Sequence, residues 1–545
     1  MTETYVTVLI SLATVAAVIV VLIVFAKLWG KSAYEKILET PKTACDIDAF
    51  VGPKYPCKSF KVAAAHRFRL GWRVANTTTP IPLECTASPH VPGLFVARNV
   101  HPQTTGGEKV TPLTDLMPRV NNDGTMDKRS TKKTVVVATI RMGFGHHRLA
   151  YSICSWAVKE NYNTIFHDML NIKSEEQGLI EEVDALYSKF SRLASELGGP
   201  IEMLWGKAMK QGDADALRIA ALAAAHLQPL LLAYPKDIPM ITTHQLVALT
   251  AAAAGFTNVI NLVVDNYPQW FLVVPRVLNL VQGPVNYQSF LKMGVKPSEL
   301  KWAGHWNPVE LVANIDADCN RRIARCQVGL MGDNNNTTTT IKPRRLLIPV
   351  GGAGAQRKFI IQLLAALKDL IEQNKIQLFL NAGDHKHMKA AFEQVLKDND
   401  MPYDTVTTTA GVYDFQKKLL DPTKEPNKAI TLFAFDEYFP AVATTDILCR
   451  VSDVLTCKPS ELAFYPIPKL HIRRVGDHEA DSARRAGELG DGTLEAREVE
   501  DAMEYVDLML NSPDLLVGMN TCIMQNNKIQ LYDGCRKAVE LVVGK

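Results

Sequence analysis

A glycine-containing turn early in the sequence has residue types that could bind a sugar or phosphate and perform acid–base chemistry. Residues 142–148 read MGFGHHR and follow the β-branched run Thr134–Ile140. Gly143 and Gly145, placed between a strand and a helix, would let a ligand approach the backbone at the positive end of the helix. His146 could act as a general base there, because the ordinary pKa of imidazole is close to working pH. The alternative is that the glycines serve tight packing and that His146 caps the helix.

A second turn of this kind occurs later, where residues 351–358 read GGAGAQRK after an apolar run. Backbone N–H groups at Gly351, Gly352 and Gly354 would be accessible to a diphosphate. Arg357 and Lys358 would add positive charge beside it. The turn lacks the Gly-Lys-Ser/Thr ending of a Walker loop, which disfavours ATPase chemistry. A glycine turn without a ligand is the alternative.

A third group of polar residues follows two further strand-like runs. The sequence KPSE begins at Lys458, so a Lys-Pro turn would precede a helix that begins at Ser460. Glu461 would then lie in the first helical turn, where a carboxylate can accept hydrogen bonds from the vicinal hydroxyls of a ribose. The loop after the next strand contains His478 and Glu479, whose side chains suit sugar hydroxyls. N-capping by Ser460 and a solvated charged loop form the alternative explanation.

The elements that must position these groups alternate between strand and helix in two successive sets. This alternation predicts an α/β protein with two parallel-sheet, Rossmann-like domains. The polar tract 334–340 cannot contribute to a core and is the expected linker. The strand-like runs expected after the second turn are Ile376–Leu380, Ile430–Phe433, Ile447–Cys449 and Lys469–Ile472.

The amino-terminal stretch Tyr5–Ala26 contains no charged residue. As a helix it would span roughly 33 Å, which is enough for the hydrocarbon core of a bilayer. Lys27, Lys31 and Lys36 follow it, so the positive-inside rule predicts a single-pass membrane protein with its N-terminus outside and its main body in the cytosol. A buried core helix is the alternative.

The predicted divisions of the chain follow from these features. They are 1–30 for the transmembrane anchor, 31–132 for a juxtamembrane extension that packs on the main body or links to it, 133–328 for the first Rossmann-like domain, 329–342 for the linker, 343–495 for the second Rossmann-like domain, and 496–545 for carboxyl-terminal helices.

Residues 58–73 interleave basic and aromatic side chains close to the expected anchor. Such a segment could contact the headgroups of an anionic membrane surface. The alternative is a solvated basic face of a strand or helix.

The composition excludes several classes of function. The chain has 60 Lys and Arg against 57 Asp and Glu, a net charge of +3, which argues against a protein whose main partner is nucleic acid. Its ten cysteines include no CxxC pair, so neither a zinc site nor a disulfide framework is expected. With 47% hydrophobic and 21% charged residues, the chain is of ordinary globular composition, and its 545 residues predict more than one domain.

The order of these motifs resembles that of GT-B glycosyltransferases, in which two Rossmann-like domains face a central crevice. The most similar group contains the monogalactosyldiacylglycerol synthases, the diacylglycerol glucosyltransferases and the peptidoglycan N-acetylglucosaminyltransferase. The resemblance covers roughly residues 134–492. It implies that His146 is the catalytic base and that the turn at Gly351 binds the donor diphosphate.

The resemblance also implies roles for three further segments. Residues 265–270, DNYPQW, match an acceptor-side segment of the family and include Asp265 and Trp270. Glu461, seven residues before a proline, matches the glutamate that binds the donor ribose. Residues 476–482 match the loop that reads the donor sugar: Glu479 is kept, the glycine is displaced by one residue, and a serine replaces the usual asparagine.

One departure from the family concerns the donor site. The family has a glycine- and threonine-containing loop between its lysine and its glutamate, and it wraps the donor diphosphate. Here Lys458 is followed directly by Pro459, Ser460 and Glu461, so that loop is missing. The chain therefore binds its donor differently, uses a different donor, or has lost transfer activity.

The resemblance implies a membrane-anchored glycosyltransferase that transfers a sugar from a nucleotide-sugar donor, expected to be a UDP-sugar, to a diacylglycerol-like lipid acceptor. No metal and no separate cofactor are expected. The missing loop favours an alternative, a catalytically silent protein of the same fold that binds a nucleotide sugar or lipid as a sensor or scaffold. A sugar-nucleotide epimerase on this fold is a third possibility, but it fits poorly with a membrane anchor.

Overall fold

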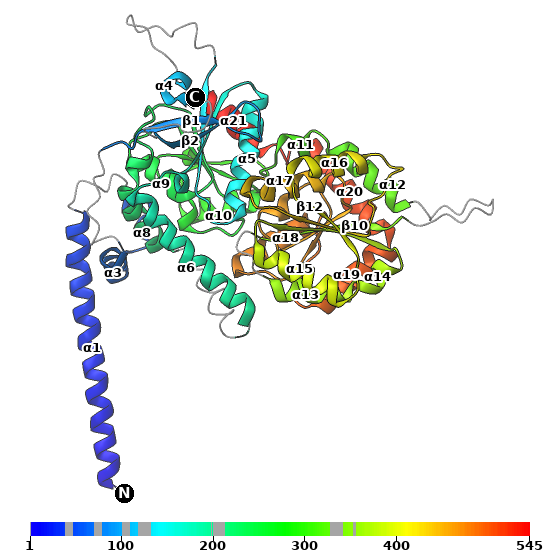
Figure 1. Cartoon of the computed structure of the whole chain (residues 1–545). Coiled ribbons are helices and arrows are strands. Elements are labelled where there is room, and N and C mark those ends of the chain that lie inside the picture. Colours follow the sequence, from blue (N-terminus) through cyan, green and yellow to red (C-terminus); the bar gives the residue numbers. More distant parts are fainter. Residues whose placement is uncertain are drawn as a thin grey trace, which may run out of the picture.

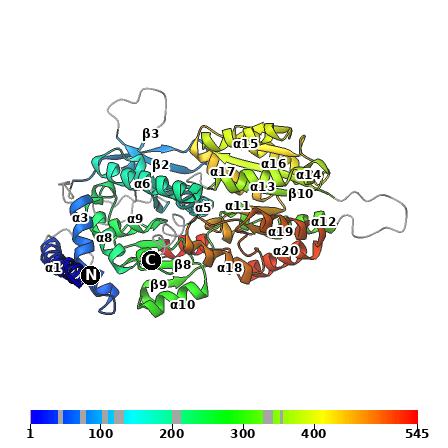
Figure 2. The same ribbon diagram turned by 90° about the horizontal axis from the view of Figure 1, so that it is seen from below.

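The computed structural model describes residues 2–38, 47–69, 79–100, 110–117, 132–197, 199, 213–327, 342–351 and 356–544. Two α/β domains lie next to each other, and helix α1 (Thr2–Leu38) extends away from the first of them (Figure 1, Figure 2). In each domain, helices cover both faces of a sheet that is mainly or wholly parallel.

The first domain has a nine-stranded sheet in the order β3-β1-β2-β5-β4-β6-β7-β8-β9. From β2 to β9 all neighbouring strands are parallel, whereas β1 is antiparallel to both β2 and β3. The strands are β1 (Leu83–Ala87), β2 (Leu94–Asn99), β3 (Val110–Pro112), β4 (Thr134–Thr139), β5 (Asn163–Asp168), β6 (Met240–Thr242), β7 (Val259–Leu262), β8 (Leu278–Val281) and β9 (Leu300–Trp302).

Strands β1 to β3 come from the segment 31–132, for which the sequence predicts an extension that packs on the main body or links to it. They continue the first domain's sheet, because β2 pairs in parallel with β5 over Leu94–Val96. The antiparallel strands therefore form one edge of an otherwise parallel sheet, a common arrangement in mixed sheets.

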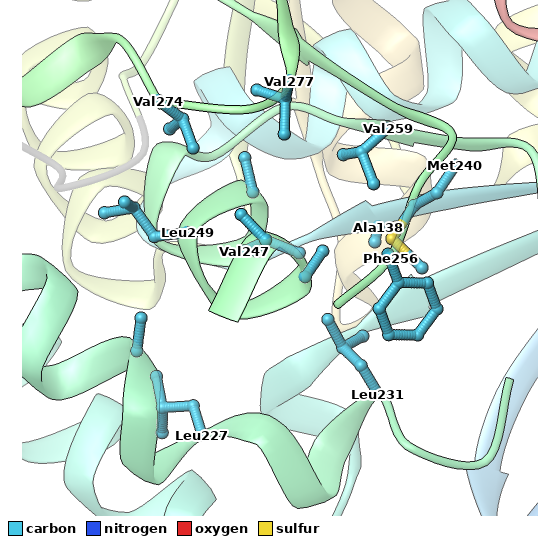
Figure 3. Close-up of a cluster of buried hydrophobic side chains, with 14 of the residues drawn as sticks. Ala138, Leu227, Leu231, Met240, Val247, Leu249, Phe256, Val259, Val274 and Val277 are labelled. Carbon is cyan, nitrogen blue, oxygen red and sulfur yellow. The ribbon is translucent and has the colours of Figure 1, made fainter. Parts of the chain in front are cut away.

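The central strand β4 shows why this sequence forms a buried strand. Val136 and Ala138 belong to one hydrophobic core, whereas Val135 and Val137 belong to another. Since alternate residues of a strand point to opposite faces, β4 is covered on both sides. Figure 3 shows part of the first core, with Val247 and Leu249 of α9 and Val259 of β7 among its side chains. Helix α9 packs against β7.

The helices of the first domain are α2 (Ile47–Val51), α3 (Ser59–Arg69), α4 (Leu113–Leu116), α5 (Phe144–Lys159), α6 (Glu175–Leu197), α8 (Ala214–His226), α9 (Gln245–Ala253), α10 (Pro284–Met293) and α11 (Val309–Val312). Helix α12 (Ile315–Gln327) follows them in sequence but packs on the second domain.

The second domain has a six-stranded, fully parallel sheet in the order β12-β13-β11-β10-β14-β15. The strands are β10 (Arg344–Pro349), β11 (Ile376–Gly383), β12 (Tyr403–Val406), β13 (Ile430–Ala434), β14 (Val454–Cys457) and β15 (Lys469–His471). The helices are α13 (Arg357–Ala366), α14 (Lys368–Glu372), α15 (Lys386–Asp398), α16 (Thr409–Leu420), α17 (Tyr438–Cys449), α18 (Ala480–Glu488), α19 (Val499–Asn511) and α20 (Pro513–Lys528). The last helix, α21 (Gly534–Val543), follows them in sequence but packs on the first domain. The prediction of an α/β protein with two parallel-sheet domains is confirmed.

One strand prediction is wrong. Ile447–Cys449, which we expected to be a strand, forms the last turn of α17, and the strand of this region is β14. The three residues are buried on a helix that packs against the sheet, so their apolar character reflects burial and does not distinguish helix from strand.

The end of the chain joins the two domains. Helix α12, which follows the first sheet, packs against α20 of the second domain. Helix α21 returns to the first domain, where Cys535 and Val539 share a hydrophobic core with Val135 of β4. In sequence, α12 follows the first domain and α21 follows the second. Each of these helices packs on the other domain.

The membrane-related predictions find little support in the fold. Within the residues that the structure describes, no helix combines the length and the apolar character needed to cross a membrane. The basic side chains Lys58 and Lys61 form ion pairs with Asp213, and Phe60 contacts Trp29 edge-on. These residues of the basic and aromatic segment thus contact the body of the protein and α1.

Candidate functional site

The first glycine turn connects β4 to α5 and is covered by the second domain. Gly143 precedes α5 with a φ of 82°, a left-handed conformation that favours glycine. Its carbonyl oxygen accepts a hydrogen bond of 3.1 Å from the hydroxyl of Tyr438. Phe144 is buried in a hydrophobic core of the second domain, and a Cβ atom on Gly383 would lie only 3.0 Å from its ring. The turn therefore contacts protein rather than solvent at these positions.

His146 is held by a backbone carbonyl of the same domain. Its Nδ1 atom lies 2.6 Å from the carbonyl oxygen of Thr243. A carbonyl can only accept a hydrogen bond, so Nδ1 carries the proton and the lone pair lies on Nε2. Burial lowers the pKa of His146, although that hydrogen bond and the charges of Asp265 and Glu461 oppose the shift. His146 is thus a neutral imidazole. It lies inside α5, whose N-cap is Gly143, and its ring bonds the carbonyl of Thr243, so the alternative that it caps the helix is wrong.

The neighbouring His147 forms a buried pair that sequence reasoning missed. Its Nε2 atom lies 3.1 Å from Oδ2 of Asp168, at the end of β5. The other carboxylate oxygen, Oδ1, accepts hydrogen bonds from the backbone N–H groups of Arg141 and Leu170. Burial raises the pKa of Asp168, but His147 and these donors outweigh it and the pKa is lowered. This pair ties the start of α5 to β5, so it orients the helix that carries His146.

Arg148 is the second residue that sequence reasoning missed, and it connects the domains. Its side chain is 2% exposed, and Nη1 donates a hydrogen bond of 2.7 Å to Oε1 of Glu461. Nη2 donates to the hydroxyl of Thr445 at 3.4 Å, and Nε lies 3.6 Å from Oδ1 of Asp446. The only sequence signal was its position at the end of the MGFGHHR turn.

Glu461, the predicted ribose ligand, lies against the first turn. A Cβ atom on Gly145 would be 3.1 Å from Oε2 of Glu461, so the glycine allows a carboxylate of the second domain to approach the turn more closely than a larger residue would. Glu461 begins a short 3₁₀ helix, Glu461–Phe464, rather than the expected α-helix. Ser460 makes no capping hydrogen bond, so the capping alternative for Ser460 is wrong.

Lys458 and Glu479 form a pair next to the second turn. Lys458 donates a hydrogen bond to Oε1 of Glu479, and its Cε lies 3.4 Å from the position of a Cβ on Gly351. Oε2 of Glu479 accepts from the backbone N–H of Val475 at 2.8 Å. Burial raises the pKa of Glu479, but Lys458 outweighs it and the pKa is lowered. Glu479 therefore holds the loop that contains His478, whose ring lies over Gly476.

The second glycine turn is described only at its two ends. Gly351 is half-buried, and Arg357 and Lys358 at the start of α13 are exposed. Gly352 and Gly354 lie outside the described residues. The two cations are therefore accessible to an anionic ligand, as a diphosphate site requires.

The two acceptor-side residues lie in different surroundings. Asp265 is half-buried and close enough to His146 for its charge to raise the pKa of that imidazole. Trp270 is 2% exposed and packs edge-on against Phe50 and Tyr55 in the first domain's core. Trp270 is therefore a core residue in this structure and does not join the other site residues.

The described residues bring His146, Gly145, Asp265 and Glu461 together where the two domains meet. Lys458, Glu479 and Gly351 form a second group on the same edge of the second sheet, since they follow β14, β15 and β10. Across the described ranges, no group of three or more His, Cys, Asp or Glu side chains is arranged to hold a metal ion. The arrangement offers a neutral imidazole, a carboxylate held by an arginine, and exposed cations, which suits proton transfer next to an anionic ligand.

Two family models without an assigned activity match separate segments of the chain. The model of one domain of unknown function (DUF6937) matches residues 97–292, and that of another (DUF6938) matches residues 295–543. No curated protein matches the chain.

Solved structures that resemble this chain distantly include proteins bound to a nucleotide sugar or a nucleotide. UDP-GlcNAc 2-epimerase from Neisseria meningitidis, bound to UDP-GlcNAc, is 11% identical with a TM-score of 0.42, and the match covers 76% of this chain and 100% of that one. A trehalose-6-phosphate protein from E. coli, bound with UDP-2-fluoro glucose, is 12% identical with a TM-score of 0.36 over 75% and 99% of the two chains. A spinosyn rhamnosyltransferase complexed with thymidine diphosphate is 13% identical with a TM-score of 0.32 over 74% and 98%. These likenesses are too distant to carry an activity to this chain.

Proposed function

We propose that this protein is a glycosyltransferase that uses a nucleotide-sugar donor, with acceptor binding in the first domain and donor binding in the second. The observation that carries the proposal is the state of His146. Its Nδ1–H is directed at the carbonyl of Thr243, its lone pair lies on Nε2, and burial lowers its pKa. A neutral imidazole held in one tautomer is what a general base requires.

In the proposed reaction, Nε2 of His146 takes the proton of an acceptor hydroxyl. The acceptor oxygen then forms a bond to the anomeric carbon of the donor sugar, and the bond from that carbon to the nucleoside diphosphate breaks. Asp265 stabilises the imidazolium, since its charge favours the protonated ring. Arg357, Lys358 and Lys458 would stabilise the charge on the leaving diphosphate.

The donor is proposed to be a UDP-sugar whose ribose contacts Glu461, with His478 and Ser460 close by. Both oxygens of Glu479 are engaged, by Lys458 and by the backbone of Val475. Glu479 is therefore proposed to shape the donor loop rather than to contact the sugar itself. No metal or further cofactor is needed for this chemistry.

The acceptor is proposed to be a membrane lipid, and α1 is proposed to hold the protein at the bilayer with its main body on the cytosolic side. The eight consecutive apolar side chains from Val18 to Phe25 are each between 49% and 68% exposed. Contiguous exposed apolar surface of this kind is characteristic of contacts with a lipid or a protein partner. The predicted divisions of the chain, with 133–328 as acceptor domain and 343–495 as donor domain, are part of this proposal.

The alternative is a catalytically silent protein that binds a nucleotide sugar or lipid as a sensor or scaffold. Two observations favour it: the glycine-containing loop between Lys458 and Glu461 is missing, and Glu461 is already paired with Arg148. A silent protein would bind the ligand without turnover.

The test is nucleotide-sugar binding and turnover by the purified full chain. UDP-, GDP- and ADP-sugars are compared by calorimetry and thermal shift, since a ligand that binds only the folded state raises its stability. Transfer from the bound donor to diacylglycerol vesicles is then measured for wild type and for His146→Gln. We expect the variant to lose turnover by about 10²- to 10⁴-fold while its donor affinity is unchanged. The exposed His387 offers a control, His387→Gln, which should retain turnover.

Each hypothesis has an outcome that contradicts it. Donor binding without turnover in the wild type would favour the silent protein, and turnover that survives His146→Gln would exclude His146 as the base. Absence of binding to every nucleotide sugar would reject the transferase and leave, of the silent alternative, only a lipid-binding protein. For the membrane, flotation with neutral and anionic vesicles compares the full chain with a chain that lacks residues 1–30; equal flotation would reject α1 as the attachment.

A further inference from the structure

We propose that Arg148 is a positioning residue for Glu461. By binding one carboxylate oxygen, Arg148 of the first domain holds the other oxygen where it can accept hydrogen bonds from a donor ribose bound by the second domain. This inference rests on the proposed function, because it names the residue that prepares the donor site.

The guanidinium of Arg148 is fixed by groups of the second domain. Nη1 contacts Oε1 of Glu461 at 2.7 Å, Nη2 contacts the hydroxyl of Thr445 at 3.4 Å, and Nε faces Asp446 at 3.6 Å. These partners are themselves held: Asn381 donates to the hydroxyl of Thr445 at 3.0 Å, and the carboxylate of Asp446 accepts from Tyr465 at 2.8 Å. Two nitrogens of the planar guanidinium donate hydrogen bonds and the third faces a carboxylate, which restricts its orientation and that of the oxygen it binds.

The second oxygen of Glu461 remains an acceptor. In the part of the chain that the structure describes, no hydrogen-bond donor reaches Oε2, and the Glu461 side chain is 14% exposed. Oε2 faces Gly145, where an added Cβ would lie at 3.1 Å. The glycine thus leaves space beside this oxygen that any other residue would fill.

A ribose ligand gains from this arrangement through conformational entropy. A glutamate side chain loses rotamer freedom when it binds a hydroxyl, and prior binding by Arg148 reduces that loss at the moment of ligand binding. Since Arg148 belongs to the first domain, the donor site is complete only when the two domains are in contact.

A second buried arginine, Arg322, has different hydrogen-bond partners from Arg148. Arg322 is buried as well, but it donates to the backbone carbonyls of Ser452 at 2.9 Å and Cys449 at 2.8 Å, and among the described residues it donates to no carboxylate. Arg322 joins α12 to the second domain and contacts no predicted site residue. It therefore provides a matched control for the loss of a buried arginine.

The test compares two nucleotides that differ only in the ribose hydroxyls. Calorimetry with the full chain gives the dissociation constants of UDP and of 2′,3′-dideoxy-UDP. For the wild type we expect UDP to bind about tenfold more tightly, as for a hydrogen bond to a charged group. In Arg148→Met and in Glu461→Gln this ratio should fall toward one. Arg148→Lys, which keeps a charge but not the fork, should restore it only in part.

Controls separate positioning from folding. Arg322→Lys should weaken both nucleotides equally or neither, with the ratio unchanged. If Arg148→Met does not fold, Thr445→Val removes one guanidinium partner and should lower the ratio to an intermediate value.

The outcomes distinguish the two proposals. An unchanged ratio in the folded Arg148 variants would overturn the positioning role while donor binding stands. A wild-type ratio of one would show that Glu461 does not read the ribose, and would overturn it as well. Absence of UDP binding by the wild type would overturn the proposed function and this inference together.

Discussion

The two glycine turns of this protein share a sequence pattern but differ in their surroundings. In the first, Phe144 is buried in a core of the second domain and the carbonyl of Gly143 accepts from Tyr438. In the second, Arg357 and Lys358 are exposed where α13 begins. A glycine turn between a strand and a helix thus indicates that a ligand or another part of the protein approaches the backbone closely. Whether it is a ligand or the other domain depends on the tertiary structure.

The largest expected effect concerns the arginine that closes the first turn. Arg148→Ala should lower the free energy of unfolding by about 3–5 kcal/mol, because it leaves the carboxylates of Glu461 and Asp446 without their buried cation. Denaturant unfolding of the full chain measures this. A loss below about 1 kcal/mol, the value of an exposed ion pair, would show that the domains are not held together there in solution.

The glycines themselves provide the next contrast. Gly145→Ala places a Cβ 3.1 Å from Oε2 of Glu461, whereas Gly351→Ala meets Lys458 only at 3.4 Å, an ordinary contact. Overpacking costs about 1–3 kcal/mol, partly offset by about 1 kcal/mol of helix propensity at Gly145. We therefore expect Gly145→Ala to be the more destabilising by thermal unfolding. If adding Glu461→Ala does not reduce that cost, the carboxylate is not its cause.

A pH-dependent effect should distinguish the first turn further. His146 has a lowered pKa in the folded state, so between that value and about 6.5 the folded state binds fewer protons than the unfolded chain. Stability therefore falls as the pH drops below about 6.5 and is unaffected by this group above it. His146→Gln should reduce the slope by at most about 1.4 kcal/mol per pH unit. Unfolding at several pH values measures it, and an unchanged slope would show that His146 is not held neutral.

The smallest effect on stability is expected in the second turn. Arg357→Ala and Lys358→Ala remove exposed side chains, so the free energy of unfolding should change by less than about 0.5 kcal/mol. Their affinity for UDP should fall, because the proposed function assigns both cations to the diphosphate of the donor. If both variants bind UDP with wild-type affinity, the second turn is not part of the donor site. The difference between the two turns would then have no functional meaning.

Much of the fold could be predicted because its signals are local. The run Thr134–Ile140 became β4, and Ile376–Leu380 and Ile430–Phe433 became β11 and β13. Runs of β-branched and aliphatic residues with glycine after them are typical of buried parallel strands. Ile447–Cys449 failed because three buried apolar residues have the same composition in a helix, and only the neighbouring sheet shows which element they form.

The residues of the candidate site could be predicted from the sequence, but the contacts between them could not. His146, Lys458 and Glu461 could be named from short motifs. The partners that define their chemistry could not: the carbonyl of Thr243 and the guanidinium of Arg148 carry no motif, and Trp270, chosen by resemblance, lies in the core. A sequence cannot show which backbone carbonyl will bind a given side chain, because every residue has one.

The sequence by itself determined the two α/β domains, the positions of both glycine turns and the residues able to move a proton or bind an anion. These depend on periodicity and residue type over short stretches of chain. Only the tertiary structure decided that Arg148 binds Glu461, 313 positions away, and that Phe144 belongs to the core of the other domain. Such contacts depend on how two separately folded sheets dock, and docking is set by surfaces assembled from distant segments.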